Sequence, residues 1–126
     1  MLAPMFRAYA LASALSGLLL VAIGAFGAHG LTDPRAKELI HTATHYQFMH
    51  TMAALAALIF WRSWGAGRAR FAPGLFFTGI AVFCGSLYAM AFGAPSWLGA
   101  LTPIGGVLFM SGWLVLAWAA LSLRAP

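Results

Sequence analysis

The pattern of hydrophobic and polar residues divides the chain into four long apolar stretches separated by short polar connections. The apolar stretches run over about residues 8–28, 42–61, 71–92 and 103–123. A transmembrane helix needs about 20 mostly apolar residues, so each stretch is long enough to cross a bilayer. All formally charged residues fall at the chain ends or in the connections. The pattern predicts an all-α integral membrane protein, a four-transmembrane-helix bundle that forms a single domain over residues 1–126.

The connection after the first stretch predicts a helix start. Thr32 or Asp33 is a suitable N-cap, and Pro34 suits the first turn of a helix. We therefore expect a short interfacial helix over residues 35–40 that leads into the second stretch. The connection over residues 62–70 contains two glycines and predicts a short loop.

The basic residues predict an orientation in the membrane. The positive-inside rule places the more basic connections in the cytoplasm, so both termini are expected to be cytoplasmic. We expect the cell inner membrane as the location, or the mitochondrial inner membrane with the termini in the matrix if the protein is eukaryotic. The residues on the cytoplasmic side are Arg7, Arg62, Arg68, Arg70 and Arg124, whereas Arg35 and Lys37 on the other side are balanced by Asp33 and Glu38.

Composition excludes most other classes of protein. The chain is 63% hydrophobic and 7% charged, whereas a soluble domain carries about a quarter charged residues. The net charge of +5 comes from scattered residues without a basic face or motif, so no nucleic-acid partner is expected. The single cysteine, Cys84, lies in an apolar stretch and is predicted to be a packing residue. The apolar run within residues 1–28 is as long as a full span, which favours a retained helix over a cleaved signal peptide.

Small residues predict where helices approach closely. Ala81, Gly85, Ala89 and Gly93 are four residues apart and share one helix face. Helices in lipid associate through close packing at such residues, so we expect this face to pack inside the bundle, to contact a second copy, or both. A homo-oligomer or a larger membrane complex is the expected assembly, with the lipid bilayer as the other partner.

A group of polar residues opens the second stretch, from His41 to His50. With the stretch starting near Thr42, His50 lies about 12 Å into the membrane, whereas His41 and His45 lie at its surface. An ionisable residue at this depth usually has a structural or functional reason. Residues of the other stretches that reach the same outer half complete a predicted polar cluster: His29, Tyr46, His50, Ser86, Tyr88 and Thr102.

Several roles for this polar cluster remain open. It can be structural, with a neutral His50 hydrogen-bonded to a neighbouring helix, or it can bind a lipid headgroup, a quinone or another small ligand. Metal or haem ligation through His50 and a proton or ion path are further alternatives. Enzymatic activity is not expected, because the only carboxylates, Asp33 and Glu38, lie in a connection and no catalytic motif is present. We therefore predict no catalytic residue, no metal site and no cofactor.

Five motifs in order resemble the YgdD-like family of small inner-membrane proteins, a domain of unknown function with small eukaryotic transmembrane relatives. The resemblance covers nearly the whole chain and implies four transmembrane helices, but no activity. It adds Gln47 to the predicted cluster and leaves His41 and His45 outside it. Cys84 stands where the family has serine, a nearly isosteric difference. The motifs are the segments 24–30 (GAFGAHG), Thr42 with Tyr46, Gln47 and His50, 85–88 (GSLY), 102–106 (TPIGG), and Gly112 with Trp113.

The leading hypothesis is a non-enzymatic accessory or structural membrane protein. Its polar outer-half cluster holds the helices together or binds a lipid or other small amphiphile. The alternatives are a metal-, haem- or quinone-binding redox subunit and a small transporter or channel.

Overall fold

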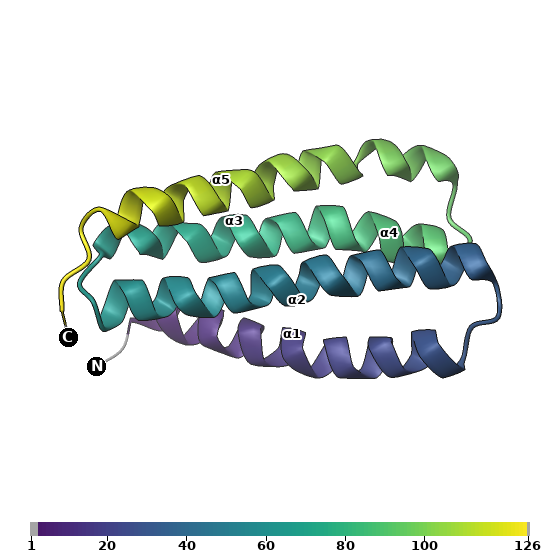
Figure 1. The fold of residues 1–126 in the computed structure, drawn as a ribbon, viewed down its shortest axis with the longest axis horizontal. Coiled ribbons are helices and arrows are strands. Elements are labelled where there is room, and N and C mark those ends of the chain that lie inside the picture. The colour runs from purple at the N-terminus through teal and green to yellow at the C-terminus, as the bar shows by residue number, and fades with distance from the viewer. Residues whose placement is uncertain (1–2, 126) are drawn as a thin grey trace.

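The computed structural model describes residues 3–125, which form four antiparallel helical columns joined by short turns (Figure 1). The first two columns are single helices, whereas the third is interrupted by a π-helical turn, and 3-10 turns precede the third and fourth. This arrangement confirms the predicted all-helical class. In chain order the elements are α1 (Pro4–His29), α2 (Pro34–Arg62), a 3-10 turn (Gly67–Phe71), α3 (Ala72–Gly79), the π-helical turn (Ile80–Cys84), α4 (Gly85–Ala91), a second 3-10 turn (Ser96–Ala100) and α5 (Thr102–Ala120).

The second column begins eight residues earlier than the apolar pattern predicts. Asp33 is its N-cap, as expected, and its side chain accepts a hydrogen bond from the backbone N–H of Arg35 at 3.3 Å. Pro34 occupies the first turn, where its missing N–H is no disadvantage. No glycine or proline follows before residue 62, so the expected interfacial helix and the expected second span are one continuous helix. The separation of the two was wrong.

The α2 helix is central to the arrangement. It packs against α1 on one side and against α3 and α4 on the other, while α5 packs mainly against α3 (Figure 1). Aromatic side chains near the two ends of α1 contact the third column, with ring centroids 6.3 Å apart for Tyr9–Phe77 and 5.9 Å apart for Phe26–Phe92. The other three columns therefore shelter α2, which buries more residues than any of them.

The α2 helix buries the most residues and yet is less apolar than the other columns. Within residues 3–125, three helical stretches are long and apolar enough to cross a membrane, namely Pro4–His29, Gly67–Ala91 and Ser96–Ala120. The α2 helix is not among them, although its 29 residues make it the longest helix. A helix that packs against neighbours on two sides can bury polar side chains if they find partners there, which explains why Gln47, His50 and Thr51 lie on α2.

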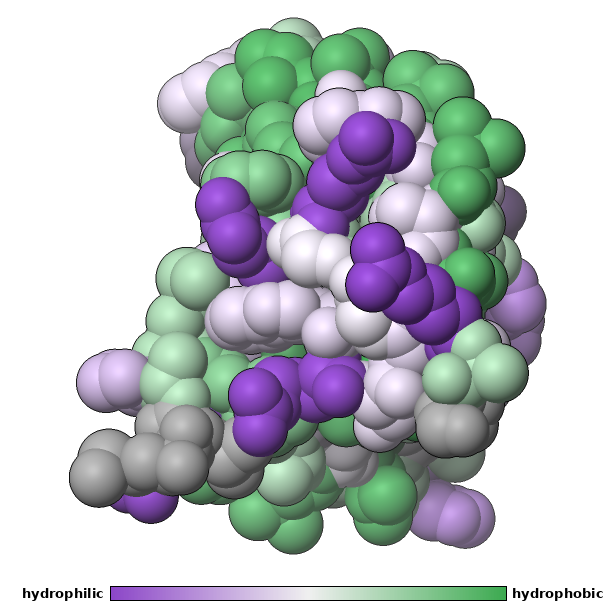
Figure 2. Space-filling view, turned by 90° about the vertical axis from the view of Figure 1, so that its left-hand side faces the viewer, coloured by the Kyte–Doolittle hydropathy of each residue, from purple (hydrophilic) through white to green (hydrophobic). Residues whose placement is uncertain are grey.

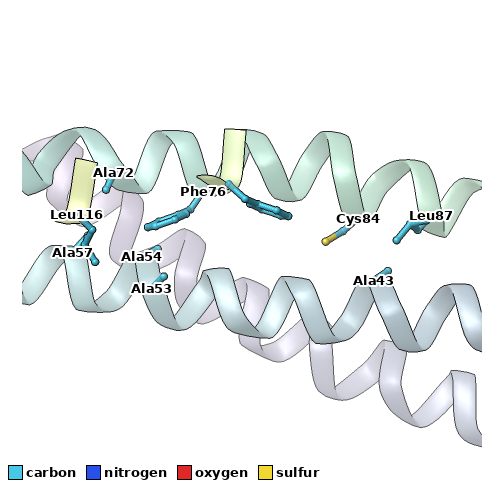
Figure 3. Close-up of a cluster of buried hydrophobic side chains, with 10 residues drawn as sticks. Ala43, Ala53, Ala54, Ala57, Ala72, Phe76, Cys84, Leu87 and Leu116 are labelled. Carbon is cyan, nitrogen blue, oxygen red and sulfur yellow. The ribbon is translucent and has the colours of Figure 1, made fainter. Parts of the chain in front are cut away.

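A layer of small and aromatic side chains forms the core between α2, α3 and α5 (Figure 3). Phe76 is fully buried and lies near Ala53 and Ala54 of α2. Cys84 is also fully buried in this core, as expected of a packing residue. The alanines of α2 allow α3 to approach closely, and Phe76 fills the space that they leave.

Glycines permit the close contact between the third and fourth columns. A Cβ atom on Gly105 would lie 2.5 Å from the backbone nitrogen of Phe83, and one on Gly112 would lie 2.5 Å from the ring of Phe76. On the opposite side, a Cβ atom on Gly79 would lie 2.5 Å from the ring of Phe109. These three positions are where only glycine fits between the columns.

The predicted small-residue stripe of the third column faces an open groove instead of the interior of the bundle. Ala81 is exposed, and nothing lies within 4 Å of a Cβ atom built on Gly85 or Gly93. Ala81, Gly85 and Ala89 line an open groove of about 490 Å³ beside α5. The expectation that this stripe packs inside the bundle was therefore wrong.

Basic side chains gather at the end where both termini lie (Figures 1 and 2). Figure 2 shows hydrophilic side chains in the middle of this end and hydrophobic ones around them. The guanidinium of Arg68 lies 4.5 Å from the ring centroid of Trp118, and that of Arg62 lies 6.0 Å from the ring of Phe6. Such contacts suit the boundary between apolar and polar surroundings.

Candidate functional site

A buried amide at the middle of the bundle joins three helices. Gln47 of α2 is 4% exposed, and its Nε2 donates to Oγ of Ser16 on α1 at 2.9 Å. Its Oε1 accepts a hydrogen bond from the hydroxyl of Tyr88 on α4 at 2.7 Å. One turn further along α2, the Thr51 hydroxyl lies 2.7 Å from the same Ser16 oxygen. Both ends of the Gln47 amide are thus used between helices.

His50 uses both ring nitrogens. Its Nδ1 lies 2.6 Å from the backbone oxygen of Tyr46, and its Nε2 lies 3.1 Å from Nε1 of Trp113 on α5. An indole N–H can only donate, so Nε2 must be the acceptor and Nδ1 must carry the proton that is donated to Tyr46. This pattern assigns a neutral imidazole. The ring also stacks on Phe109, with centroids 3.5 Å apart, so one face of the imidazole is covered.

A pair of hydroxyl groups joins the last two columns. Ser86 of α4 donates to the backbone oxygen of Phe83 at 2.8 Å, and its Oγ lies 2.7 Å from Oγ1 of Thr102 on α5. Because the single Ser86 proton goes to Phe83, the Thr102 hydroxyl donates to Ser86. Within the described residues, no buried side-chain nitrogen or oxygen is left without a partner. We call the residues joined by these bonds the polar network: Ser16, Gln47, His50, Thr51, Ser86, Tyr88, Thr102 and Trp113.

The structure separates the seven predicted site residues into sets. Gln47 and Tyr88 bond to each other, Ser86 bonds to Thr102, and Tyr46 and His50 share one face of α2. These three sets do not close around one common cavity. His29 stands apart, because it ends α1 as an exposed residue. Their role in binding a ligand remains a prediction.

Three members of the polar network were missed by reasoning from the sequence. Ser16 and Thr51 are single hydroxyl residues in apolar stretches, and nothing in the pattern shows that they face each other. Trp113 offered a usable signal, because an indole N–H far from both ends of an apolar span needs an acceptor inside the protein. His50 and Gln47 were the available acceptors at a similar depth.

The arrangement offers little for metal or haem binding. Among residues 3–125, no group of three or more histidine, cysteine, aspartate or glutamate side chains lies close enough to hold a metal ion. His50 would have to give up its bond to Tyr46 or to Trp113 before either ring nitrogen could ligate a metal. The chemistry that the polar network provides is hydrogen bonding between helices.

Several apolar helical stretches and a buried polar network define a multi-pass helical membrane protein. The family described as "Protein of unknown function (DUF423)" matches residues 23–106. The chain is 43% identical to a UPF0382 membrane protein of Haemophilus influenzae, over 85% of this chain and 88% of that protein. It is 36% identical to the UPF0382 membrane protein YwdK of Bacillus subtilis, over 90% and 96%, and 34% identical to the UPF0382 inner membrane protein YgdD of Escherichia coli, over 89% and 88%.

The chain therefore belongs to this family of membrane proteins of unknown function, which confirms the resemblance seen in the motifs. No solved structure matches the chain.

Proposed function

We propose that this chain is a non-enzymatic structural or accessory protein of the cell inner membrane, in which all four helical columns cross the bilayer. The α2 helix would be about 43 Å long at 1.5 Å per residue, which exceeds a hydrocarbon core of about 30 Å. Its buried polar side chains, Gln47, His50 and Thr51, are hydrogen-bonded to the other columns. Both features support a fourth crossing despite the low hydropathy of α2. The printed name of the Escherichia coli relative supports the inner membrane.

We propose further that both termini are cytoplasmic. The arginines at the end with the termini have no acidic residue among them, whereas Asp33 and Glu38 offset Arg35 and Lys37 at the other end. The positive-inside rule assigns the first of these ends to the cytoplasm.

The observation that carries the structural role is the Gln47 amide, which bonds to α1 on one side and α4 on the other. A residue that binds a ligand keeps a polar atom free for it, but both polar ends of Gln47 are already used inside the protein. The same holds for the two ring nitrogens of His50. The polar network is best suited to fix the rotation of each helix against its neighbours.

A Gln47→Leu variant tests this role. It would leave the Tyr88 hydroxyl without a partner, remove one of the two partners of the Ser16 hydroxyl, and lower the free energy of unfolding by about 1–3 kcal/mol. Melting of the detergent-solubilised protein measures the effect, with Met49→Leu as a control because Met49 is 38% exposed on the same helix. Native mass spectrometry in mild detergent completes the test. Unchanged melting together with loss of a bound small molecule would show that Gln47 serves a ligand instead.

The redox and transport alternatives have less support. A haem or metal ligand at His50 would compete with two hydrogen bonds, and Phe109 already covers one face of the ring. A transport path through the middle of the bundle would have to displace the core around Phe76. A visible absorption band that disappears in His50→Leu would favour the redox alternative over our proposal.

Association with a second copy or a larger complex remains a prediction. The stripe of Ala81, Gly85 and Ala89 lines an open groove and would allow another helix to approach closely. Native mass spectrometry of the wild-type protein reports the number of copies directly, and a Gly85→Leu variant tests whether this stripe is the contact.

A further inference from the structure

An open hollow lies between α1 and α2 at the end opposite the termini, apart from the polar network. It consists of two adjoining parts of about 290 and 350 Å³ that share Gly24, His41 and Thr44 as lining residues. We call the two parts together the lateral hollow. His41 and His45, which the depth argument placed at the membrane surface, both belong to its lining.

The packing of α1 on α2 explains why the lateral hollow exists. At Gly27 the helices are in close contact, since a Cβ atom there would lie 2.7 Å from Cγ2 of Ile40. Further along the pair, Ser16 of α1 is hydrogen-bonded to Gln47 and Thr51 of α2. Between these points, nothing lies within 4 Å of a Cβ atom built on Gly24. The absence of a side chain at Gly24 therefore leaves space between two points where the helices are held together.

One wall of the lateral hollow carries a row of side chains that can donate hydrogen bonds. Lys37, His41 and His45 are four residues apart on α2, so they share one face, and all three are exposed. In the part of the chain that the structure describes, none of these side chains forms a hydrogen bond within the protein, in contrast to His50. Neither Asp33 nor Glu38 lines the hollow. The wall is thus rich in donors and free of carboxylates.

The deeper part of the lateral hollow is apolar. Leu20 and Val21 of α1 and Phe48 of α2 line it, and Phe48 lies about 16 Å along α2 from Lys37. The hollow therefore changes from cationic to apolar in the direction that leads from the membrane surface into the hydrocarbon.

We propose that the lateral hollow binds an anionic phospholipid. Lys37 and His41 donate to the phosphate, which accepts strong hydrogen bonds from charged donors, and an acyl chain lies along Leu20 and Phe48. A zwitterionic headgroup is disfavoured because its ammonium would find no carboxylate in the lining. This site rests on the proposed crossing of the membrane by α2, since the hollow must open toward the lipid headgroups.

The test uses native mass spectrometry of the intact protein in mild detergent, titrated with phosphatidylglycerol or phosphatidylethanolamine carrying the same acyl chains. We expect the wild-type protein to retain phosphatidylglycerol about tenfold more strongly. The Lys37→Gln/His41→Gln double variant should lose this preference. Arg35→Gln is the charge control, because it removes one positive charge from the same end of α2 without touching the lining.

A second pair of variants tests the shape of the site. Gly24→Leu places a side chain into the hollow from a position where a Cβ atom meets nothing within 4 Å, and should weaken phosphatidylglycerol retention about tenfold. Gly17→Leu is its matched control, because Gly17 also lies in α1 with nothing within 4 Å of its Cβ position and lines neither part of the hollow. The melting temperature of each variant shows that the fold is retained.

Three results would overturn the lipid site: equal retention of the two lipids, an equal loss in Arg35→Gln, or undiminished retention in Gly24→Leu. Cysteine labelling at Thr32 and Ser63, the residues flanking α2, tests the membrane crossing separately. Failed lipid retention with Thr32 outside and Ser63 inside would reject the lipid site alone. Both residues on one side would reject the proposed crossing itself.

Discussion

Trp113 and His50, 63 positions apart in the chain, are joined by a hydrogen bond of 3.1 Å from the indole Nε1 to the imidazole Nε2. This contact links α5 to α2 and determines which ring nitrogen of His50 carries the proton. It also holds the imidazole flat against Phe109. Trp113 is 41% exposed, so a side chain that faces outward nevertheless satisfies a buried histidine.

Removing the indole donor should destabilise the protein. Trp113→Phe leaves Nε2 of His50 without a partner, and we expect a loss of about 1 kcal/mol in the free energy of unfolding. Chemical unfolding in detergent measures this loss, with Trp97→Phe as the control because Trp97 is 66% exposed in a turn. A double-mutant cycle with His50→Leu should give a coupling of about 0.6 kcal/mol. Zero coupling would mean that the bond contributes nothing to stability.

Two neighbouring glycines of α5 should respond in opposite directions to alanine. Gly105→Ala brings a Cβ atom to 2.5 Å from the backbone of Phe83, which cannot rotate away, so we expect a loss of about 1–3 kcal/mol. Gly106→Ala meets no atom within 4 Å and should raise stability by up to about 1 kcal/mol through helix propensity. Thermal melting of both variants checks the prediction. Equal effects would contradict the close packing of α5 on the third column.

The hydroxyl pair of Ser86 and Thr102 should contribute modestly. Ser86→Ala and Thr102→Ala each remove one partner of a 2.7 Å bond between α4 and α5, with an expected loss of about 0.5–1.5 kcal/mol each. The double variant should lose less than the sum, because each single variant already breaks the bond. Ser111→Ala is the control, since that hydroxyl bonds only to Val107 of its own helix. Full additivity would show that the two hydroxyls act independently.

The proposed orientation predicts a labelling pattern. In a Cys84→Ser background, cysteines at Thr32 and Ser96 should react with an impermeant maleimide on intact cells. A cysteine at Ser63 should react only after permeabilisation. All three positions are exposed, so burial does not limit the reaction. The reverse pattern would invert the topology.

The elements of the fold were largely predictable, because hydropathy reports which segments avoid water. The apolar runs located the first, third and fourth columns to within a few residues. The start of α2 was misplaced because its N-terminal half is polar, and hydropathy alone cannot separate an interfacial helix from the end of a long sheltered one. The N-cap at Asp33 was identified by its local chemistry and needed no tertiary information.

The partners in the polar network were less predictable. Depth along a helix follows from counting residues, so His50 was recognised, whereas Gln47 was added by the resemblance to the family. Their partners depend on the rotation of each column, which the π-helical turn alters between residues 80 and 84. The Ala81, Gly85 and Ala89 stripe lines an open groove, and it is Gly79 that meets Phe109. Sequence periodicity assumes an unbroken helix and could not anticipate either result.

The central position of α2 also constrains the order in which the polar network is completed during synthesis. Domains and segments emerge from the N-terminus first, so α1 and α2 exist as a pair before α4 and α5 are made. At that stage Gln47 can bond to Ser16 but not to Tyr88, and His50 has only the Tyr46 carbonyl of its own helix. In the proposed crossing, α2 therefore enters the membrane with its bonds to Tyr88 and Trp113 still to form.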